Sequence, residues 1–263
     1  MKLGSKASYS NRNKSCSLVL ERFGSVKLPA SFNWVDHGVV TPIKHQGPCG
    51  SCVDFGTIAT VEAAYHLQLG RPLTNFSEQD VVNCFANFGR GGCSASWADE
   101  VLEFIMTRGL VKSKGWYGNT SLDSDYKAKV LECDEKPKLV PEKLVDYCFY
   151  VNLPDDQKLM ELVYNMGPVI VPISTYDRSL LYLKDAPYVT GCGRRSGGHV
   201  IAMVGWTEEY FILKNSWGSN WGSNGYLHLA RNKNNENCNY RNFAAVPIFK
   251  KPTFSFGAKF SSS

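Results

Sequence analysis

The sequence predicts an α+β protein with two lobes, and three observations lead to that prediction. Segments with helical periodicity fill the first half of the chain, whereas short β-branched and aromatic runs bounded by Gly, Pro and Asn fill the second. Helices followed by strands are typical of α+β folds. The 263 residues, 43% hydrophobic and 20% charged, suffice for a packed core in one large domain or in two lobes sharing a cleft.

The predicted helices are marked by their ends. A first helix runs from Val53 to Gly70, which stops it, and its apolar stripe is interrupted by Glu62. Ser77 is the expected N-cap of a second helix, and Gly109 ends a third. The second and third helices, and one that precedes the first strand, are expected over residues 77–82, 97–107 and 155–166.

Four strands are predicted in the second half, from runs rich in Val, Ile, Tyr, Phe and Leu. They cover residues 169–173, 200–204, 210–213 and 225–230.

Three regions divide the chain. Residues 1–27 are polar and basic without periodicity, and we expect an N-terminal arm or a propeptide remnant. Residues 28–250 form the compact domain, and residues 251–263 are expected to be a flexible C-terminal tail. The first 15 residues lack the apolar core of a signal peptide, so a processed product is expected.

The net charge is +5 and no Lys/Arg block stands out, so nucleic acid is not an expected partner. No stretch is apolar and long enough to span a bilayer, so no membrane contact is expected.

Nine cysteines suggest four disulfides and one free thiol in an oxidising compartment. Sequons at Asn13, Asn75 and Asn119 are compatible with a secretory route and with glycosylation. A structural zinc module is a poor alternative, because Cys49 and Cys52 form one Cys-x-x-Cys pair and no second pair matches it. No metal and no cofactor are therefore expected.

One cysteine has the setting of a nucleophile. Cys52 ends the segment Gln46-Gly47-Pro48-Cys49-Gly50-Ser51-Cys52 and begins the first predicted helix, where the helix dipole favours a thiolate. A thiolate needs an imidazole, and His199 lies between small residues and a predicted strand. Asn215 follows another strand and is a candidate to orient that imidazole. Singly, a Cys, His, Asn or Gln is more often structural, but this order in Gly-bounded segments favours catalysis.

These segments resemble the papain-like cysteine proteases of the cathepsin L-like kind over about residues 28–250. The resemblance implies a helical lobe and an antiparallel, β-barrel-like lobe with the active site in the cleft between them. It is carried by residues 46–52, 77–84, 167–169, 198–200 and 215–226.

The resemblance also implies roles for five residues. Cys52 would be the nucleophile and His199 the general base and acid, with Asn215 orienting His199 and Trp217 shielding that contact from water. The Gln46 side chain and the Cys52 backbone N–H would form the oxyanion hole.

A disulfide pattern is likewise implied by the resemblance: Cys49–Cys93, Cys84–Cys133 and Cys192–Cys238, with Cys52 free. The mite group of digestive cysteine proteases has a comparable extra bridge from an N-terminal arm, so Cys16–Cys148 is predicted. The alternative is that Cys16 lies in a disordered tail.

The chain departs from this family in two places beside the site. Val53-Asp54 follows the nucleophile, where the family usually has Trp and then Ala or Ser. A buried, unpaired Asp54 would be costly and, if close to His199, would favour its protonated form. Ser94-Ala95-Ser96 replaces the Asn-Gly-Gly that binds the substrate backbone in the family, which crowds that approach.

The expected S2 pocket combines bulky and small residues, and an apolar P2 preference is predicted. By the resemblance, its lining comprises Trp97, Pro172, Gly197, Gly198 and Phe243.

The sequence thus predicts a monomeric thiol endopeptidase acting on peptides or proteins, lysosomal or secreted, and made as a precursor. Its own propeptide and cystatin-like inhibitors are the expected partners. The alternative is a papain-fold binding protein with weak or no proteolysis, favoured by the two departures beside the site.

Overall fold

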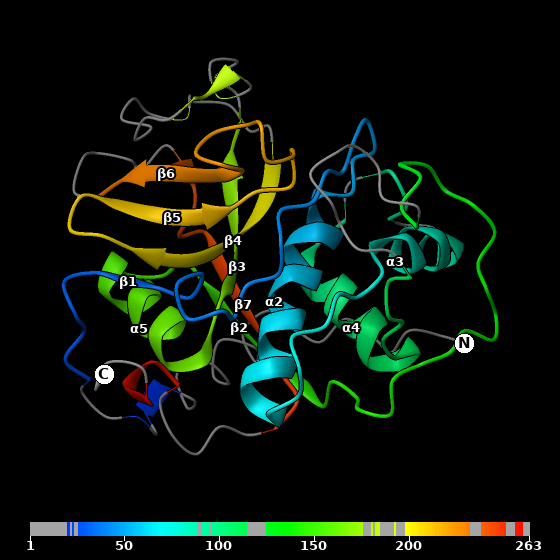
Figure 1. Cartoon of the computed structure of the whole chain (residues 1–263), viewed down its shortest axis with the longest axis horizontal. Helices are drawn as coiled ribbons and strands as arrows, with labels where there is room; N and C mark the ends of the chain where they lie inside the picture. The colour runs from blue at the N-terminus through cyan, green and yellow to red at the C-terminus, as the bar shows by residue number, and fades with distance from the viewer. Residues whose placement is uncertain are drawn as a thin grey trace.

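The computed structural model contains a helical lobe and a sheet lobe that pack side by side (Figure 1). It describes residues 20–21, 23, 26–88, 91–94, 96–114, 125–175, 180, 182–184, 192, 198–231, 238–250 and 256–259. The predicted two-lobe α+β fold is confirmed.

The helical lobe contains α2 (Cys52–Leu69), α3 (Glu78–Phe85), the short 3-10 helix η1 (Ala86–Phe88) and α4 (Ala98–Arg108). Their ends follow the predicted signals. The Ser77 hydroxyl accepts a hydrogen bond from the Asp80 N–H at 3.1 Å, which caps α3. Gly70 adopts φ 64° after α2, a left-handed conformation that glycine tolerates.

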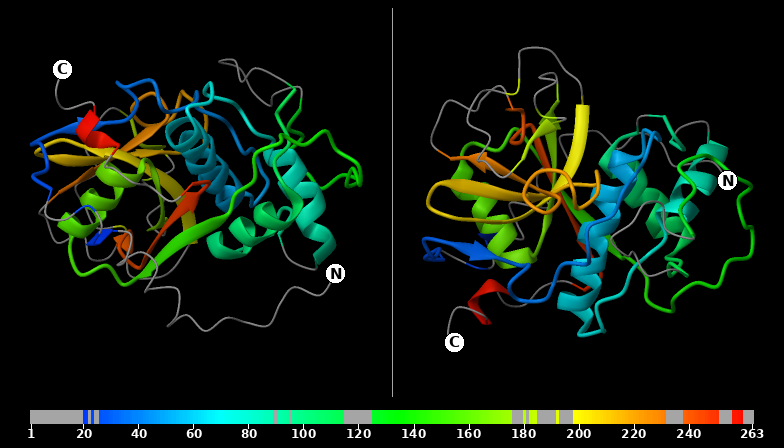
Figure 2. Two further views of the ribbon diagram at one scale, coloured as in Figure 1. Left: turned by 90° about the horizontal axis from the view of Figure 1, so that it is seen from below. Right: turned by 45° about the horizontal axis from the view of Figure 1, so that its top comes forward.

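Helix α2 is buried on more than one face, which differs from the predicted single apolar stripe. It lies between the sheet and the other helices, as both views in Figure 2 show. Neighbours on both sides include β4 and β7 of the sheet lobe and α4 of the helical lobe. Burial therefore extends to its polar positions, among them Glu62, which is 0% exposed.

The sheet lobe is built on one antiparallel sheet with the order β2-β7-β3-β4-β5-β6, and β1 pairs with β4. Helix α5 (Asp156–Met166) packs against β3 and β4. The strands are β1 (Phe32–Asn33), β2 (Asp146–Val151), β3 (Val169–Ser174), β4 (Gly198–Trp206), β5 (Tyr210–Lys214), β6 (Tyr226–Ala230) and β7 (Phe243–Ile248). The sequence did not predict β1, β2 or β7.

Both ends of the chain contribute to the core of the sheet lobe. Leu20 and Phe256 are buried there, and Phe23 and Val26 pack against the same core. The Phe256 N–H donates to the Asn165 carbonyl at 3.2 Å in front of the short helix η4 (Gly257–Lys259). Phe256 thus packs against the described core, while the expected flexible tail over residues 251–263 stays a prediction.

Three disulfides join described cysteines: Cys49–Cys93, Cys84–Cys133 and Cys192–Cys238. Cys148 is fully buried and disulfide-bonded. Its expected partner Cys16 lies outside the described residues, so that pairing stays a prediction. Asn13 and Asn119 of the three sequons also lie outside them. Within the described residues, no helix combines the length and apolar character needed to cross a membrane.

Candidate functional site

The free thiol of Cys52 lies at the junction of the two lobes. Cys52 is the first residue of α2, so the unpaired N–H groups of the first helical turn surround it. From the other lobe, the backbone of Val200 in β4 donates a hydrogen bond that lowers the pKa of the thiol. Since Val200 follows His199, this contact brings the candidate nucleophile and the candidate base to one place.

The His199 ring is held in one tautomer by Asn215. Its Nε2 lies 2.7 Å from Asn215 Oδ1, which also accepts the Ser216 backbone N–H at 2.8 Å. An oxygen that only accepts requires an N–H on Nε2, and in the neutral ring Nδ1 is then free to take a proton. His199 begins the buried part of β4, and Asn215 directly follows β5, the next strand of the sheet.

Trp217 covers the His199–Asn215 contact. Its ring lies 4.6 Å from the His199 ring between centroids, with an interplanar angle of 34°. Trp221 packs edge-on against Trp217 at 4.9 Å and fixes it in turn. The aromatic layer limits the access of water to the imidazole.

Gln46 is oriented by hydrogen bonds at both ends of its amide. Oε1 accepts the Ser216 hydroxyl at 2.7 Å, and Nε2 donates to the Cys49 carbonyl at 2.9 Å. One of the two Nε2 hydrogens remains for another acceptor. The residue is 7% exposed, so burial and these two hydrogen bonds together hold the donor in place.

Burial shifts both titrating groups of the site toward their neutral forms. Burial lowers the pKa of His199 to about 4, and the hydrogen bond to Asn215 partly opposes that shift. Burial likewise raises the pKa of the Cys52 thiol, and the Asp54 carboxylate raises it further. A thiolate–imidazolium pair here therefore depends on the mutual attraction of its two charges, the helix N-terminus and the Val200 N–H.

Asp54, the departure noted in the sequence, is buried beside the candidate nucleophile Cys52. It is 1% exposed, and its Oδ1 has no hydrogen-bond partner among the described residues. Burial, together with the Glu78 carboxylate, raises the pKa of Asp54 well above its ordinary value. Asp54 acts on the Cys52 thiol, whereas burial and Asn215 shift His199. The expected effect of Asp54 on His199 is therefore replaced by an effect on Cys52.

A buried charge cluster lies behind the site and connects three elements. Lys44 Nζ donates to Glu62 of α2 and Glu78 of α3, each at 2.6 Å. Burial disfavours the Lys44 ammonium, but these two carboxylates outweigh it and raise its pKa. Lys214 of β5 donates to the Thr41 carbonyl and hydroxyl at 2.8 Å, and burial lowers its pKa to about 8.

The expected substrate-binding residues fall into two groups. The first group, on the helical lobe, comprises Ser94, Ser96 and Trp97. The preceding residue Cys93 is tied to the loop before Cys52 in two ways: by its disulfide to Cys49, and by its carbonyl, which accepts a hydrogen bond from the Gly50 N–H. Trp97 is 55% exposed, and Ala95 and Gly197 lie outside the described residues.

The other group lies in the sheet. Pro172 pairs with Val200, and extending the Ile170–Ala245 register places Pro172 opposite Phe243. Phe243 stacks on Phe149 at 5.4 Å and is half-buried. Gly198 begins β4, and no atom of the described residues lies within 4 Å of a Cβ added there.

Sequence reasoning missed Tyr126. This residue is 1% exposed, and its hydroxyl bonds to the Gln46 carbonyl and to Ser51, which precedes Cys52. No signal in the sequence marks it, because 80 residues separate Tyr126 from Gln46.

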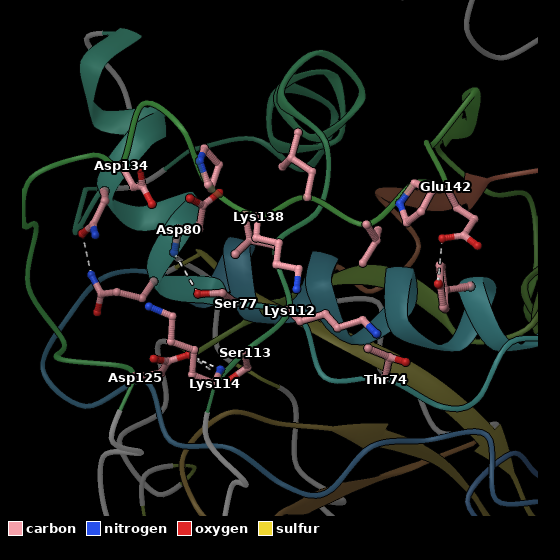
Figure 3. A pocket seen from close by; sticks show the side chains of 18 of the residues that line it. Thr74, Ser77, Asp80, Lys112, Ser113, Lys114, Asp125, Asp134, Lys138 and Glu142 are labelled. Carbon is pink, nitrogen blue, oxygen red and sulfur yellow. Dashed lines mark hydrogen bonds between the residues drawn. The ribbon is translucent and has the colours of Figure 1, made fainter.

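A separate groove lies on the helical lobe (Figure 3). It has a volume of about 950 Å³ and contains none of Cys52, His199 or Asn215. Side chains of both charges line it, so it shows no preference for one charge of ligand. They include Lys112, Lys114, Lys138, Asp80, Asp125, Asp134 and Glu142. Within the described residues, no three His, Cys, Asp or Glu side chains cluster as a metal site would require.

Comparison with known proteins gives one family. The family described as "Papain family cysteine protease" matches residues 28–248. "Cysteine proteinase 3" of Dictyostelium discoideum is 33% identical over 246 residues, 91% of this chain and 69% of that protein. A "Cathepsin L-like" protein of Caenorhabditis elegans is 32% identical over 246 residues, 90% of this chain and 69% of that protein.

Solved structures agree with these relatives. The digestive procathepsin L2 proteinase of Tenebrio molitor superposes with a TM-score of 0.72 at 32% identity, covering 85% of this chain and 69% of that one. Bromelain from Ananas comosus gives a TM-score of 0.72 at 28% identity, covering 85% of this chain and 100% of that one. The chain therefore belongs to the papain family of cysteine proteases and is a cysteine-type peptidase.

Proposed function

We propose that this chain is a thiol endopeptidase in which Cys52, His199, Asn215 and Gln46 carry the reaction. The observation that carries the proposal is a free thiol at the start of α2 that contacts the backbone of Val200, the residue after His199, while His199 itself lies 2.7 Å from Asn215. A thiol, an oriented imidazole and a buried amide donor are the parts that acyl transfer to a cysteine requires.

In the proposed reaction, the Cys52 proton passes to His199 Nδ1 and the sulfur attacks the scissile carbonyl carbon. The carbonyl oxygen becomes an oxyanion, which accepts hydrogen bonds from the free Nε2–H of Gln46 and the Cys52 N–H. His199 returns its proton to the leaving amine as the C–N bond breaks, leaving a thioester. Water, deprotonated by His199, then hydrolyses the thioester and restores the thiol. Asn215 keeps the His199 imidazole in one orientation through each proton transfer.

An apolar P2 preference is part of the proposal. Pro172 and Phe243 lie on neighbouring strands next to the start of β4, and both present apolar surface. Trp97 adds an exposed indole from the helical lobe. Substrate profiling should show hydrophobic residues at P2, and a preference for Asp or Glu there would contradict the apolar pocket.

The biological setting is proposed from relatives. Mouse procathepsin L, by its name a precursor, is 30% identical over 233 residues. We accordingly propose that residues 28–250 form the peptidase domain of a lysosomal or secreted enzyme, made as a precursor and restrained by its propeptide and by cystatin-like inhibitors.

The test is selective alkylation of the nucleophile. Iodoacetamide or an epoxide inhibitor at mildly acidic pH should label Cys52 and abolish hydrolysis of a peptide substrate. His199→Ala should lose both labelling and hydrolysis, because the thiol then has no proton acceptor. His228→Ala is the matched control: His228 stacks on Tyr210 at 4.3 Å in the sheet lobe, and its loss should leave both intact.

The alternative, a papain-fold binding protein, is favoured by the buried carboxylate of Asp54 beside Cys52. A correctly folded protein that neither labels at Cys52 nor cleaves peptides would support that alternative and reject the endopeptidase.

A further inference from the structure

Tyr126 joins the two ends of the loop that leads into the nucleophile. Its hydroxyl donates to the Gln46 backbone carbonyl at 3.0 Å and lies 2.7 Å from the Ser51 hydroxyl. A phenol has one proton, so Ser51 is the donor in the second bond. The chain of hydrogen bonds therefore runs from Ser51 through Tyr126 to Gln46.

The ring of Tyr126 is held by packing, in addition to the hydrogen bonds of its hydroxyl. It packs edge-on against Phe55 of α2, with centroids 4.9 Å apart and an interplanar angle of 89°. Cys49 and Val82 complete this small buried cluster, and Cys49 is tied to Cys93. Phe55 lies within the first turn of the helix that Cys52 begins, so the ring relates the loop directly to that helix.

The hydroxyl also stays a donor over the whole working range. Burial, with smaller contributions from the Asp54 and Glu78 carboxylates, raises the pKa of Tyr126 to about 12, while the Ser51 hydrogen bond opposes the shift. A neutral phenol at every relevant pH keeps its bond to the Gln46 carbonyl.

We propose that Tyr126 is a positioning residue for peptide hydrolysis, whose hydroxyl fixes the oxyanion-hole residue Gln46 relative to Cys52. Gln46 is otherwise held by its side-chain bonds to Ser216 and Cys49 and by its backbone N–H to the Ser216 carbonyl. These bonds attach Gln46 to the sheet lobe and to its own loop, whereas Tyr126 attaches it to the start of α2. The inference rests on the catalytic roles proposed above.

Tyr126→Phe removes one oxygen and leaves the ring packing in place. We expect kcat for a peptide amide to fall about tenfold with KM nearly unchanged, because oxyanion donors act on the transition state. Alkylation of Cys52 by iodoacetamide forms no oxyanion, so its rate should remain within about twofold of wild type. A purely structural residue would lower both rates together.

A double-mutant cycle with Gln46→Ala isolates the proposed link. Once the Gln46 amide is absent, Tyr126→Phe should have almost no further effect on kcat. The matched control is Tyr147→Phe. The Tyr147 hydroxyl donates a 2.8 Å hydrogen bond to Glu103 and contacts none of the proposed catalytic residues in that bond, so its removal should leave kcat unchanged.

Each outcome decides the inference. A selective loss of kcat that disappears in the Gln46→Ala background supports it. An unchanged kcat, a parallel loss of alkylation, or full additivity with Gln46→Ala overturns it while the endopeptidase proposal stands. A wild-type protein that neither hydrolyses peptides nor labels at Cys52 overturns both.

Discussion

Asp54 places a buried carboxyl group in the first turn of α2, the helix that Cys52 begins. Its Oδ1 has no hydrogen-bond partner among the described residues. The nearby carboxylate of Glu78 repels a negative charge on Asp54 and so helps burial to raise the pKa of Asp54. Lys44 bonds to Glu78 and Glu62. The acid groups facing Asp54 are thus Glu78 from α3, Cys52 from its own helix and Tyr126.

This carboxyl makes stability depend on pH. Unfolded, Asp54 ionises near its ordinary pKa of 3.8, whereas in the fold it keeps its proton to a higher pH. Between these two values the folded state binds the extra proton, so the free energy of unfolding falls as pH rises. Below the unfolded pKa both states are protonated and Asp54 has no such effect.

Asp54→Asn keeps the shape and removes the ionisation. We expect the variant to be more stable than wild type at about pH 7, because folding then no longer raises the pKa of a buried carboxyl group. Near pH 4, roughly the unfolded pKa, the gain should vanish. Denaturant unfolding at both pH values measures it. Iodoacetamide labelling should also show a lower apparent pKa for Cys52, since a raising charge is gone.

The control for Asp54→Asn is Asp146→Asn, at an exposed carboxylate in β2. That substitution should change stability little at either pH. An equal gain for Asp54→Asn at both pH values would show that ionisation of Asp54 has no part in the effect.

Single residues of the site differ in how well the sequence predicted them. Cys52, His199 and Asn215 are marked by short motifs, because each lies at a fixed place on a helix or strand. Tyr126 and Lys44 are not marked, since their roles arise from contacts across 80 and 34 residues of chain, respectively. Nothing local in a sequence encodes such contacts.

Helices α2 and α3 are held together through one buried ammonium group. Lys44 is 4% exposed and bridges Glu62 and Glu78, both 0% exposed, at 2.6 Å. Glu62 also accepts from the Thr41 hydroxyl and the Phe76 N–H. Removing the cation would leave two buried carboxylates without their direct ion-pair partner, and the more distant Lys214 ammonium would compensate them only in part.

Lys44→Met should therefore lower the free energy of unfolding by about 3–5 kcal/mol at neutral pH. The loss should be smaller at acidic pH, where the two carboxylates can take up protons. Lys158→Met is the matched control, because Lys158 pairs with Glu161 on a partly exposed face of α5 and should cost about 0–1 kcal/mol. Similar losses for both variants would contradict the role of Lys44 in joining the helices.

The elements themselves were predicted where local signals are strong. Ser77, Gly70 and Gly109 marked helix ends within one or two residues of the observed ones, because capping depends on local backbone geometry. β7 was missed because it contains two alanines and Pro247, which are poor strand signals. It forms a strand because β2 and β3 flank it, and that context comes from the fold.

The two lobes meet along a contact that also fixes the positions of Cys52 and His199 relative to each other. Helix α2 carries Cys52 on the helical lobe and packs against β4, which carries His199 on the sheet lobe. At the contact, an added Cβ on Gly56 would lie 3.1 Å from Val200 Cγ1 and 3.3 Å from the Val200 carbonyl oxygen. Gly56 is one turn after Cys52, and Val200 directly follows His199. The spacing of the lobes at this point therefore sets the spacing of the thiol and the imidazole.

Gly56→Ala should thus act on catalysis more than on folding. The methyl group requires a shift of a few tenths of an ångström, since backbone as well as side chain stands in its way. Misplacement of reacting groups by about 1 Å can cost about 100-fold in rate, so we expect kcat to fall about tenfold for this smaller shift. Gly70→Ala is the control at the other end of α2: Gly70 has φ 64°, and no atom in the described part of the chain lies within 4 Å of the added Cβ. It should destabilise the protein by about 1 kcal/mol through backbone strain and leave kcat unchanged. Peptide hydrolysis and thermal unfolding of both variants separate the two effects. If both variants lost activity only in proportion to stability, the α2–β4 contact would serve packing alone.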